Sequence, residues 1–177
     1  MRQWLIGYGS LMDQASAERT LGTGIELVPV VLAGWQRNFN LAISNSSHYR
    51  CRICAGGRQG IAAADAQPAT GSSMAAMAIK VSEQQLMDAD QREISYQRVQ
   101  VTDKDLPLEG LVWIYQGLDK HRDGAKVLPA GYWQLIAQAA EQHPSREIIL
   151  KEAPKLPLAD LELIRYNGKQ IQGTCSC

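Results

Sequence analysis

The sequence lacks any excess of charge of one sign. Eighteen Lys and Arg residues balance eighteen Asp and Glu residues, so the formal net charge at pH 7 is zero. No run of five or more like charges occurs, whereas a nucleic-acid backbone or an anionic lipid surface is bound by such clusters of Lys and Arg. We therefore expect neither a nucleic acid nor a membrane as a partner.

Long hydrophobic runs and a secretory leader are also missing. No stretch is long and apolar enough to cross a bilayer. The first residues do not show the basic segment followed by an apolar segment that marks a secretory signal. We therefore expect a cytoplasmic protein, in which thiols stay reduced.

Cysteine is scarce, and its spacing is the one feature that suggests a metal. The four cysteines form two close pairs, Cys51-x-x-Cys54 and Cys175-x-Cys177. Neighbouring thiolates can share a zinc ion or form a disulfide, so a small zinc or thiol-redox protein is one hypothesis. The alternating stretch HYRCRIC favours an extended chain instead, which sends positions three apart to opposite faces. We therefore expect no metal site.

Several catalytic motifs are absent. There is no phosphate-binding P-loop and no H-E-x-x-H zinc motif, and Ser10 lacks the G-x-S-x-G frame of a serine hydrolase. The stretch GYGSLM is not a dinucleotide-binding fingerprint either, because its third glycine would fall at Met12. Phosphoryl transfer, serine hydrolysis and dinucleotide binding therefore have no support.

The length and the 45% hydrophobic content suit one substantial core, so we predict a single domain over residues 1–177 with a less regular C-terminal segment at 151–177. Strand patterns outnumber helix patterns, which predicts an α+β fold with a small, mixed, β-barrel-like sheet and peripheral helices. The Gly- and Ala-rich stretch 44–72 is expected to be irregular. We expect strands at 3–8, 26–35, 37–44, 74–81, 96–101 and 109–116, and helices at 12–22, 82–90 and 128–143.

A turn directly after the first predicted strand is the first candidate site. Gly9, Ser10 and Leu11 would present successive backbone N–H groups at a helix N-terminus, where unpaired donors favour a carboxylate or an oxyanion. An ordinary turn, with Ser10 acting as a helix cap, is the alternative. Glu93 is the second candidate, because it lies between an apolar helix and a strand and could point inward. The alternative is a solvated surface Glu that pairs with Arg92 or Arg98.

Four short motifs in this order resemble the γ-glutamylcyclotransferase-like family. They are the Tyr8-Gly9-Ser10-Leu11 turn, the segment LAGWQRNFN at 32–40, Asp90-x-x-Glu93 followed by Tyr96-x-Arg98, and a late helix entered at Tyr132. Together they cover roughly residues 4–143. The resemblance implies a γ-glutamylcyclotransferase-like fold whose pocket works without a metal or a cofactor.

The resemblance also implies an activity, the cyclisation of a γ-glutamyl group to 5-oxoproline with release of an amine or amino acid, possibly from glutathione. It assigns Glu93 as the catalytic residue and a small-molecule γ-glutamyl compound as the partner. A non-catalytic module that binds γ-glutamyl or amino-acid ligands remains the alternative. The residues assigned to substrate binding are Gly7, Tyr8, Gly9, Ser10, Leu11 and Tyr132.

Other residues within these motifs are given supporting roles. Trp35 and Phe39 alternate as residues of one strand face do, and we expect them in the core. Tyr96 and Arg98 are expected to support the loop that carries Glu93. The three histidines show no metal-ligand spacing and are expected at the surface.

Overall fold

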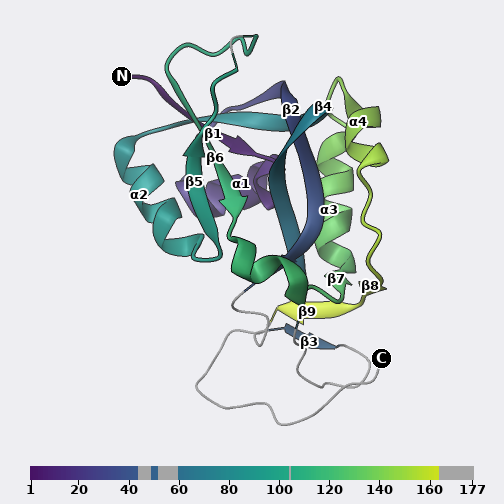
Figure 1. The fold of residues 1–177 in the computed structure, drawn as a ribbon. Helices are drawn as coiled ribbons and strands as arrows, with labels where there is room; N and C mark the ends of the chain where they lie inside the picture. Colours follow the sequence, from purple (N-terminus) through teal and green to yellow (C-terminus); the bar gives the residue numbers. More distant parts are fainter. Residues whose placement is uncertain (44–48, 52–59, 104, 164–177) are drawn as a thin grey trace.

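The fold is built on one central sheet. The computed structural model describes residues 1–43, 49–51, 60–103 and 105–163 (Figure 1). The sheet has five strands in the order β2-β4-β1-β6-β5, and β1 pairs antiparallel with β4 and parallel with β6. The predicted α+β class is confirmed, but the sheet is open rather than closed. The strands are β1 (Gln3–Gly7), β2 (Leu27–Ala42), β4 (Ala62–Val81), β5 (Tyr96–Gln100) and β6 (Leu111–Gly117).

Helices cover both faces of the sheet. Successive side chains of a strand point to opposite faces, and accordingly Leu5 belongs to the apolar cluster under α1 and α2, whereas Ile6 belongs to the cluster under α3 and α4. In Figure 1, α2 lies at the left of the sheet and α3 and α4 lie together at the right. The helices are α1 (Gln14–Leu21), α2 (Glu83–Arg92), α3 (Ala130–Ala140) and α4 (Arg146–Lys151).

Local capping signals set the start of two helices. The Ser82 hydroxyl accepts a hydrogen bond from the Gln85 backbone N–H, and the Gln85 side chain accepts one from the Ser82 N–H. This capping box begins α2 at the position expected from the sequence. The Asp13 carboxylate caps α1. Ser10 therefore does not act as the cap of that helix.

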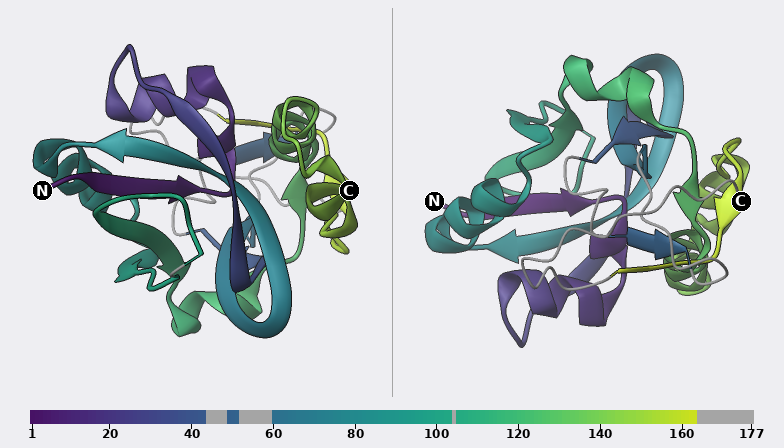
Figure 2. Two further views of the ribbon diagram at one scale, coloured as in Figure 1. Left: turned by 90° about the horizontal axis from the view of Figure 1, so that it is seen from above. Right: turned by 90° about the horizontal axis from the view of Figure 1, so that it is seen from below.

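The long ribbon of β2 and β4 corrects one prediction. Residues 62–72 were expected to be irregular, yet β4 begins at Ala62 and pairs with β2 over most of its length. The partner strand satisfies the backbone hydrogen bonds, so weak side chains do not prevent regular structure there. The remainder, residues 44–48 and 52–59, lies outside the described residues. β2 is one strand that bends at Gly34, which has a positive φ of 76° and interrupts the pairing with β4; the ribbon curls strongly (Figure 2).

The predictions of buried and exposed side chains have different outcomes. Phe39 is buried and contacts Trp133 edge-on, while Trp35 packs against the same cluster from a partly exposed position. His143 was expected at the surface and is instead buried, with a ring nitrogen 3.0 Å from the Ala76 carbonyl oxygen. The polar residues around His143 suggested exposure, whereas its contact with Ala76 of β4 buries it.

Short elements complete the described chain. Two minor sheets join β3 to β9 and β7 to β8, and two 3₁₀ helices, η1 and η3, follow β1 and β6. β8 and β9 come from the segment that was predicted to be less regular. These elements are η1 (Ser10–Met12), β3 (Tyr49–Cys51), η3 (Asp119–Gly124), β7 (Leu128–Pro129), β8 (Leu158–Ala159) and β9 (Leu161–Leu163).

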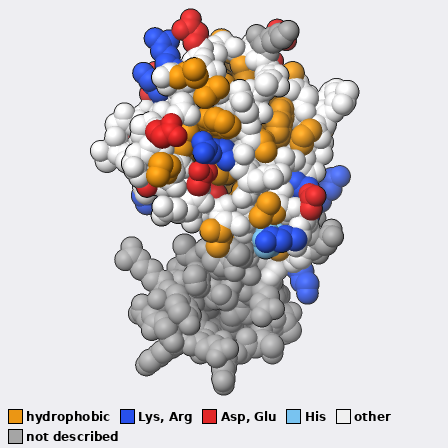
Figure 3. Space-filling view, turned by 60° about the vertical axis from the view of Figure 1, so that its left-hand side comes forward, with side chains coloured by type: hydrophobic (Ala, Val, Ile, Leu, Met, Phe, Trp, Pro, Cys, Tyr) orange, Lys and Arg blue, Asp and Glu red, His pale blue; other side chains and the backbone are white. Residues whose placement is uncertain are grey.

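The surface carries charges of both signs. On the face in Figure 3, acidic and basic side chains are interspersed among apolar ones and do not gather in one large patch. Within the described ranges, no helix combines the length and the hydropathy that a membrane span requires.

Candidate active site

A small cavity lies where the turn after β1 meets the end of α2 and the start of α3. Its volume is about 50 Å³. The structure brings together at this cavity every residue that the sequence assigned to the site, although those roles stay predictions. The lining residues are Ile6, Gly7, Tyr8, Gly9, Ser10, Leu11, Ala64, Glu93, Tyr96, Tyr115 and Tyr132.

The two glycines of the turn are required by close packing. A Cβ on Gly9 would lie 2.5 Å from the Tyr132 phenol oxygen, and a Cβ on Gly7 would lie 2.7 Å from the Leu11 Cβ. Neither separation is sterically possible. A glycine at position 9 would allow a ligand to approach the backbone closely. In the structure, the group that approaches Gly9 is the Tyr132 hydroxyl.

The turn that lines the cavity carries several backbone N–H groups. In η1 the Met12 N–H donates to the Gly9 carbonyl oxygen at 3.1 Å. The preceding N–H groups, those of Gly9, Ser10 and Leu11, donate to no backbone carbonyl in the described part of the chain. They are the unpaired donors that the first turn of any helix leaves, and their residues line the cavity.

Glu93 is positioned by the helix that ends before it. Its N–H donates to the Ala89 carbonyl oxygen at 2.9 Å and so closes the last turn of α2. Its carbonyl oxygen accepts from the Tyr96 N–H at 2.9 Å, which forms the tight turn into β5. Both ends of this turn are therefore fixed, and the carboxylate lies on the cavity wall.

The carboxylate of Glu93 is shielded, and its ion pair with Arg92 is long. Its side chain is 19% exposed, and burial raises its pKa above the ordinary value, although Arg92 partly opposes this shift. The Arg92 Nε lies 3.7 Å from the Glu93 Oε1, too far for a hydrogen bond. Arg98 pairs with Asp90 at 3.0 Å instead. Glu93 is thus largely shielded from solvent, while it keeps a long ion pair with Arg92, one of the two partners that the alternative hypothesis named.

Four tyrosines line the cavity, and the hydroxyls of three of them bond to the backbone around it. The Tyr8 hydroxyl donates to the Tyr115 carbonyl oxygen at 2.5 Å, and the Tyr96 hydroxyl donates to the Ala64 carbonyl oxygen at 2.8 Å. The Tyr132 hydroxyl accepts from the Ala64 N–H at 3.3 Å. Burial raises the pKa of Tyr8 and of Tyr96, so both phenols stay neutral near pH 7.

Sequence reasoning missed part of this wall. Tyr96 was expected only as a support for the loop of Glu93, and Tyr115 and Ala64 were not singled out. The position of Tyr96, three residues after Glu93, was a usable signal. Tyr115 and Ala64 reach the cavity through strand pairing between distant segments, and no local sequence pattern predicts such contacts.

A wider cleft adjoins the cavity and shares Ser10, Glu93, Tyr96 and Tyr132 with it. Its volume is about 750 Å³. Since four lining residues are common to both, we treat the two hollows as one continuous site with a narrow inner end.

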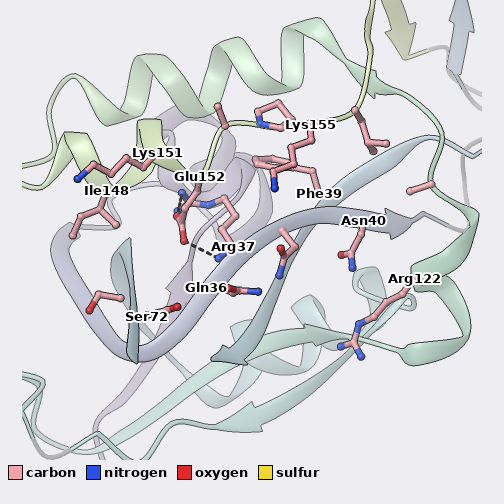
Figure 4. A pocket seen from close by; sticks show the side chains of 16 residues that line it. Gln36, Arg37, Phe39, Asn40, Ser72, Arg122, Ile148, Lys151, Glu152 and Lys155 are labelled. Atoms are coloured by element: carbon pink, nitrogen blue, oxygen red, sulfur yellow. Dashed lines mark hydrogen bonds and ion pairs between the residues drawn. The ribbon is translucent and has the colours of Figure 1, made fainter. Parts of the chain in front are cut away.

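Behind the turn, a buried arginine holds the backbone of Tyr8. The Arg37 Nε donates to the Tyr8 carbonyl oxygen at 2.6 Å, and Nη2 donates to the Ala75 carbonyl oxygen at 2.6 Å. Nη1 forms an ion pair with Glu152 at 2.9 Å (Figure 4). Arg37 and Glu152 also line a separate pocket of about 620 Å³.

The role of Arg37 was not predicted, although the sequence carried a signal. Arg37 alternates with Trp35 and Phe39, so the strand period places all three on one face. Because the other two are apolar, this pattern puts a charged side chain on an inward face. Such a cation needs buried partners, and the structure supplies them.

The cysteine hypothesis gains no support. Within the described residues, no group of His, Cys, Asp and Glu side chains has an arrangement that could hold a metal ion. Cys51 is the last residue of β3. Cys54, Cys175 and Cys177 lie outside the described residues.

The fold is that of the γ-glutamyl cyclotransferases. A γ-glutamyl cyclotransferase structure matches with a TM-score of 0.63 and 14% identity, over 96% of this chain and 93% of that chain. An uncharacterized protein from Homo sapiens matches with 0.64 and 14%, over 94% and 91% of the two chains. A yeast γ-glutamyl cyclotransferase described as specific to glutathione matches with 0.55 and 14%, over 85% and 96%. No protein-family model and no curated protein sequence matches this chain.

Proposed function

We propose that this protein is a γ-glutamylcyclotransferase-type enzyme. It converts the γ-glutamyl group of a small molecule to 5-oxoproline and releases an amine or an amino acid. The observation that carries the proposal is the shielded carboxylate of Glu93, which faces a turn of unpaired backbone donors across one cavity. The fold shared with γ-glutamyl cyclotransferases supports the same conclusion.

The substrate supplies its own nucleophile. The α-amino nitrogen of a γ-glutamyl group can reach its own γ-carbonyl carbon and close a five-membered ring. Well-oriented intramolecular reactions reach effective molarities of about 10⁵–10⁸ M. The protein therefore needs to hold the substrate folded and to move protons, and the proposed reaction requires no metal or cofactor.

Glu93 is the proton carrier in this mechanism. An α-ammonium group has a pKa of about 8, whereas an ordinary Glu has one of about 4.3 and is a weak base for it. Burial raises the pKa of Glu93 and so reduces this mismatch. Glu93 takes a proton from the α-ammonium, and the freed lone pair then attacks the γ-carbonyl carbon.

The second half of the reaction returns the proton. The bond from the γ-carbon to the leaving nitrogen breaks as Glu93 protonates that nitrogen, and the ring nitrogen gives up its surplus proton. The α-nitrogen loses two protons in total, and the released amine, once in water, has gained two. Glu93 ends as the carboxylate with which it began.

The turn and the phenol take the positioning roles. Backbone N–H groups of Gly9, Ser10 and Leu11 would stabilise the negative charge that develops on the γ-carbonyl oxygen or hold the substrate carboxylate. Donors of this kind contribute about 10²–10³-fold each. The Tyr132 hydroxyl, fixed against Gly9 and Ala64, limits where the glutamyl arm can lie.

The direct test is release of 5-oxoproline by the purified protein. The panel contains γ-glutamyl amino acids, glutathione and γ-glutamyl amines, and we expect turnover of at least one. Glu93→Gln should lower kcat by about 10²–10⁴-fold because it removes the proton carrier. Glu109→Gln, on an exposed carboxylate, is the matched control and should keep full activity. Full activity of Glu93→Gln would refute the mechanism; ligand binding without turnover by the unaltered protein would favour the non-catalytic binding module.

A further inference from the structure

The charge of the wide cleft points to a class of leaving group. Among the described residues, three charged side chains line this cleft, namely Arg19, Arg92 and Glu93. Glu93 also lines the narrow cavity, whereas the two arginines do not. Beyond the carboxylate that carries the proton, the charged side chains that the described residues contribute to the cleft are therefore positive.

The two arginines come from neighbouring helix ends. Arg19 lies in the last turn of α1 and Arg92 in the last turn of α2, and both are solvent-exposed. Arg92 is tethered to the Thr20 hydroxyl and lies near Glu93. Arg19 forms no ion pair within the part of the chain that the structure describes. A guanidinium with open donors thus stands at the cleft, next to one whose position is fixed.

A substrate in this site would extend its leaving group into the cleft. The γ-carbonyl carbon must lie between Glu93 and the turn for the proposed reaction, at the narrow end. The departing part then occupies the wider space, since both hollows share four residues. An amino acid or peptide there carries a free carboxylate, which a guanidinium binds with paired, charge-assisted hydrogen bonds. An alkylamine offers no such acceptor, and a diamine would bring a repelled cation.

We propose that Arg19 and Arg92 select γ-glutamyl compounds whose leaving group carries a free carboxylate. This inference rests on the proposed function and names its substrate class. Arg19 is the cleaner probe, because Arg92 also lies beside Glu93 and its loss would affect that carboxylate as well.

The test compares two substrates that differ only in the leaving-group carboxylate. They are γ-glutamylalanine and γ-glutamylethylamide, in which a hydrogen replaces that carboxylate. The measured quantity is the ratio of their kcat/KM values. We expect the unaltered protein to prefer γ-glutamylalanine by about 10-fold or more, as one charge-assisted contact allows. The preference should shrink as ionic strength rises, because both arginines are exposed.

Variants assign the preference to residues. Arg19→Gln should lower the ratio by about 10-fold through loss of γ-glutamylalanine turnover, since the lost contact is charge-assisted. Arg146→Gln replaces an exposed arginine on α4 and should leave the ratio unchanged. Equal losses on both substrates would overturn the inference, because the arginines would then serve the glutamyl part or the fold. A preference for γ-glutamylethylamide would overturn it as well.

A binding measurement separates this inference from the proposed chemistry. The Glu93→Gln variant should bind both substrates without consuming them. A larger rise in its melting temperature with γ-glutamylalanine than with γ-glutamylethylamide, abolished by adding Arg19→Gln, supports the inference even if no 5-oxoproline is ever released. Equal rises with both ligands would refute it even if the enzyme is active.

Discussion

Glu152 and Glu93 each have an arginine neighbour, but the two ion pairs differ in geometry. Glu152 meets Arg37 through two contacts of 2.9 Å, one to the guanidinium and one to the backbone N–H. Glu93 has Arg92 only at 3.7 Å. The first pair is closed and satisfied, whereas the second leaves a shielded carboxylate free to exchange a proton. Distance to the counterion, rather than burial alone, separates structural support from potential chemistry.

The largest expected effect is on stability, at the closed pair. Glu152→Gln leaves the guanidinium of Arg37 buried without a counterion, and removing one partner of a buried pair costs about 3–5 kcal/mol of unfolding free energy. Denaturant titration measures this loss. Glu93→Gln has no tight pair to break and should be at least as stable as the unaltered protein near pH 7. Equal stability of the two variants would remove the contrast between the pairs.

The next effect concerns the packing of the turn. Gly9→Ala places a methyl group against the Tyr132 phenol oxygen, and this overpacking should cost about 1–3 kcal/mol of unfolding free energy, which denaturant titration measures. Tyr132→Phe removes the clashing oxygen, so the double variant should recover part of the loss. A double variant no better than Gly9→Ala alone would show that the contact is not the cause.

The smallest effect is a pH dependence that belongs to Glu93. Its raised pKa means that the folded protein holds this proton more tightly than the unfolded chain, where Glu titrates near about 4.3. Unfolding free energy therefore falls as pH rises from that value through the raised pKa. Over the same range kcat/KM should rise, because the carboxylate is the active form.

Unfolding curves at several pH values check this prediction. Glu93→Gln cannot ionise, so its stability relative to the unaltered protein should increase with pH across the window. Glu109→Gln, at an exposed carboxylate, should show no such trend. A constant difference between Glu93→Gln and the unaltered protein would contradict the assigned cause.

Short sequence patterns predicted those helix starts that depend on neighbouring residues. The capping box at Ser82 and Gln85 fixed the start of α2, and the end of that helix places Glu93 at the cavity. The prediction of an irregular stretch was wrong for residues 62–72, because their strand depends on a partner in β2. β propensity alone does not report strand pairing. The assignment of residues 1–177 to a single domain stays a prediction.

The candidate site was only half visible in the sequence. The turn after β1 and Glu93 stood out because short motifs carry them. Tyr96 and Arg37 lie within the same motifs, but the partners that give them their roles are distant in sequence, and so are those of the cleft arginines. Arg37 and Glu152 are 115 positions apart in the chain, beyond the reach of any short motif.

That separation has a consequence for biosynthesis. Translation delivers the turn at residues 8–11 early, but the acid that neutralises the cation behind it emerges from the ribosome only after residue 152 has been added. Until then the guanidinium beneath the turn has no counterion. The turn thus gains its full support only once Glu152 is available, and a nascent chain halted before that residue carries the motif without the ion pair behind it.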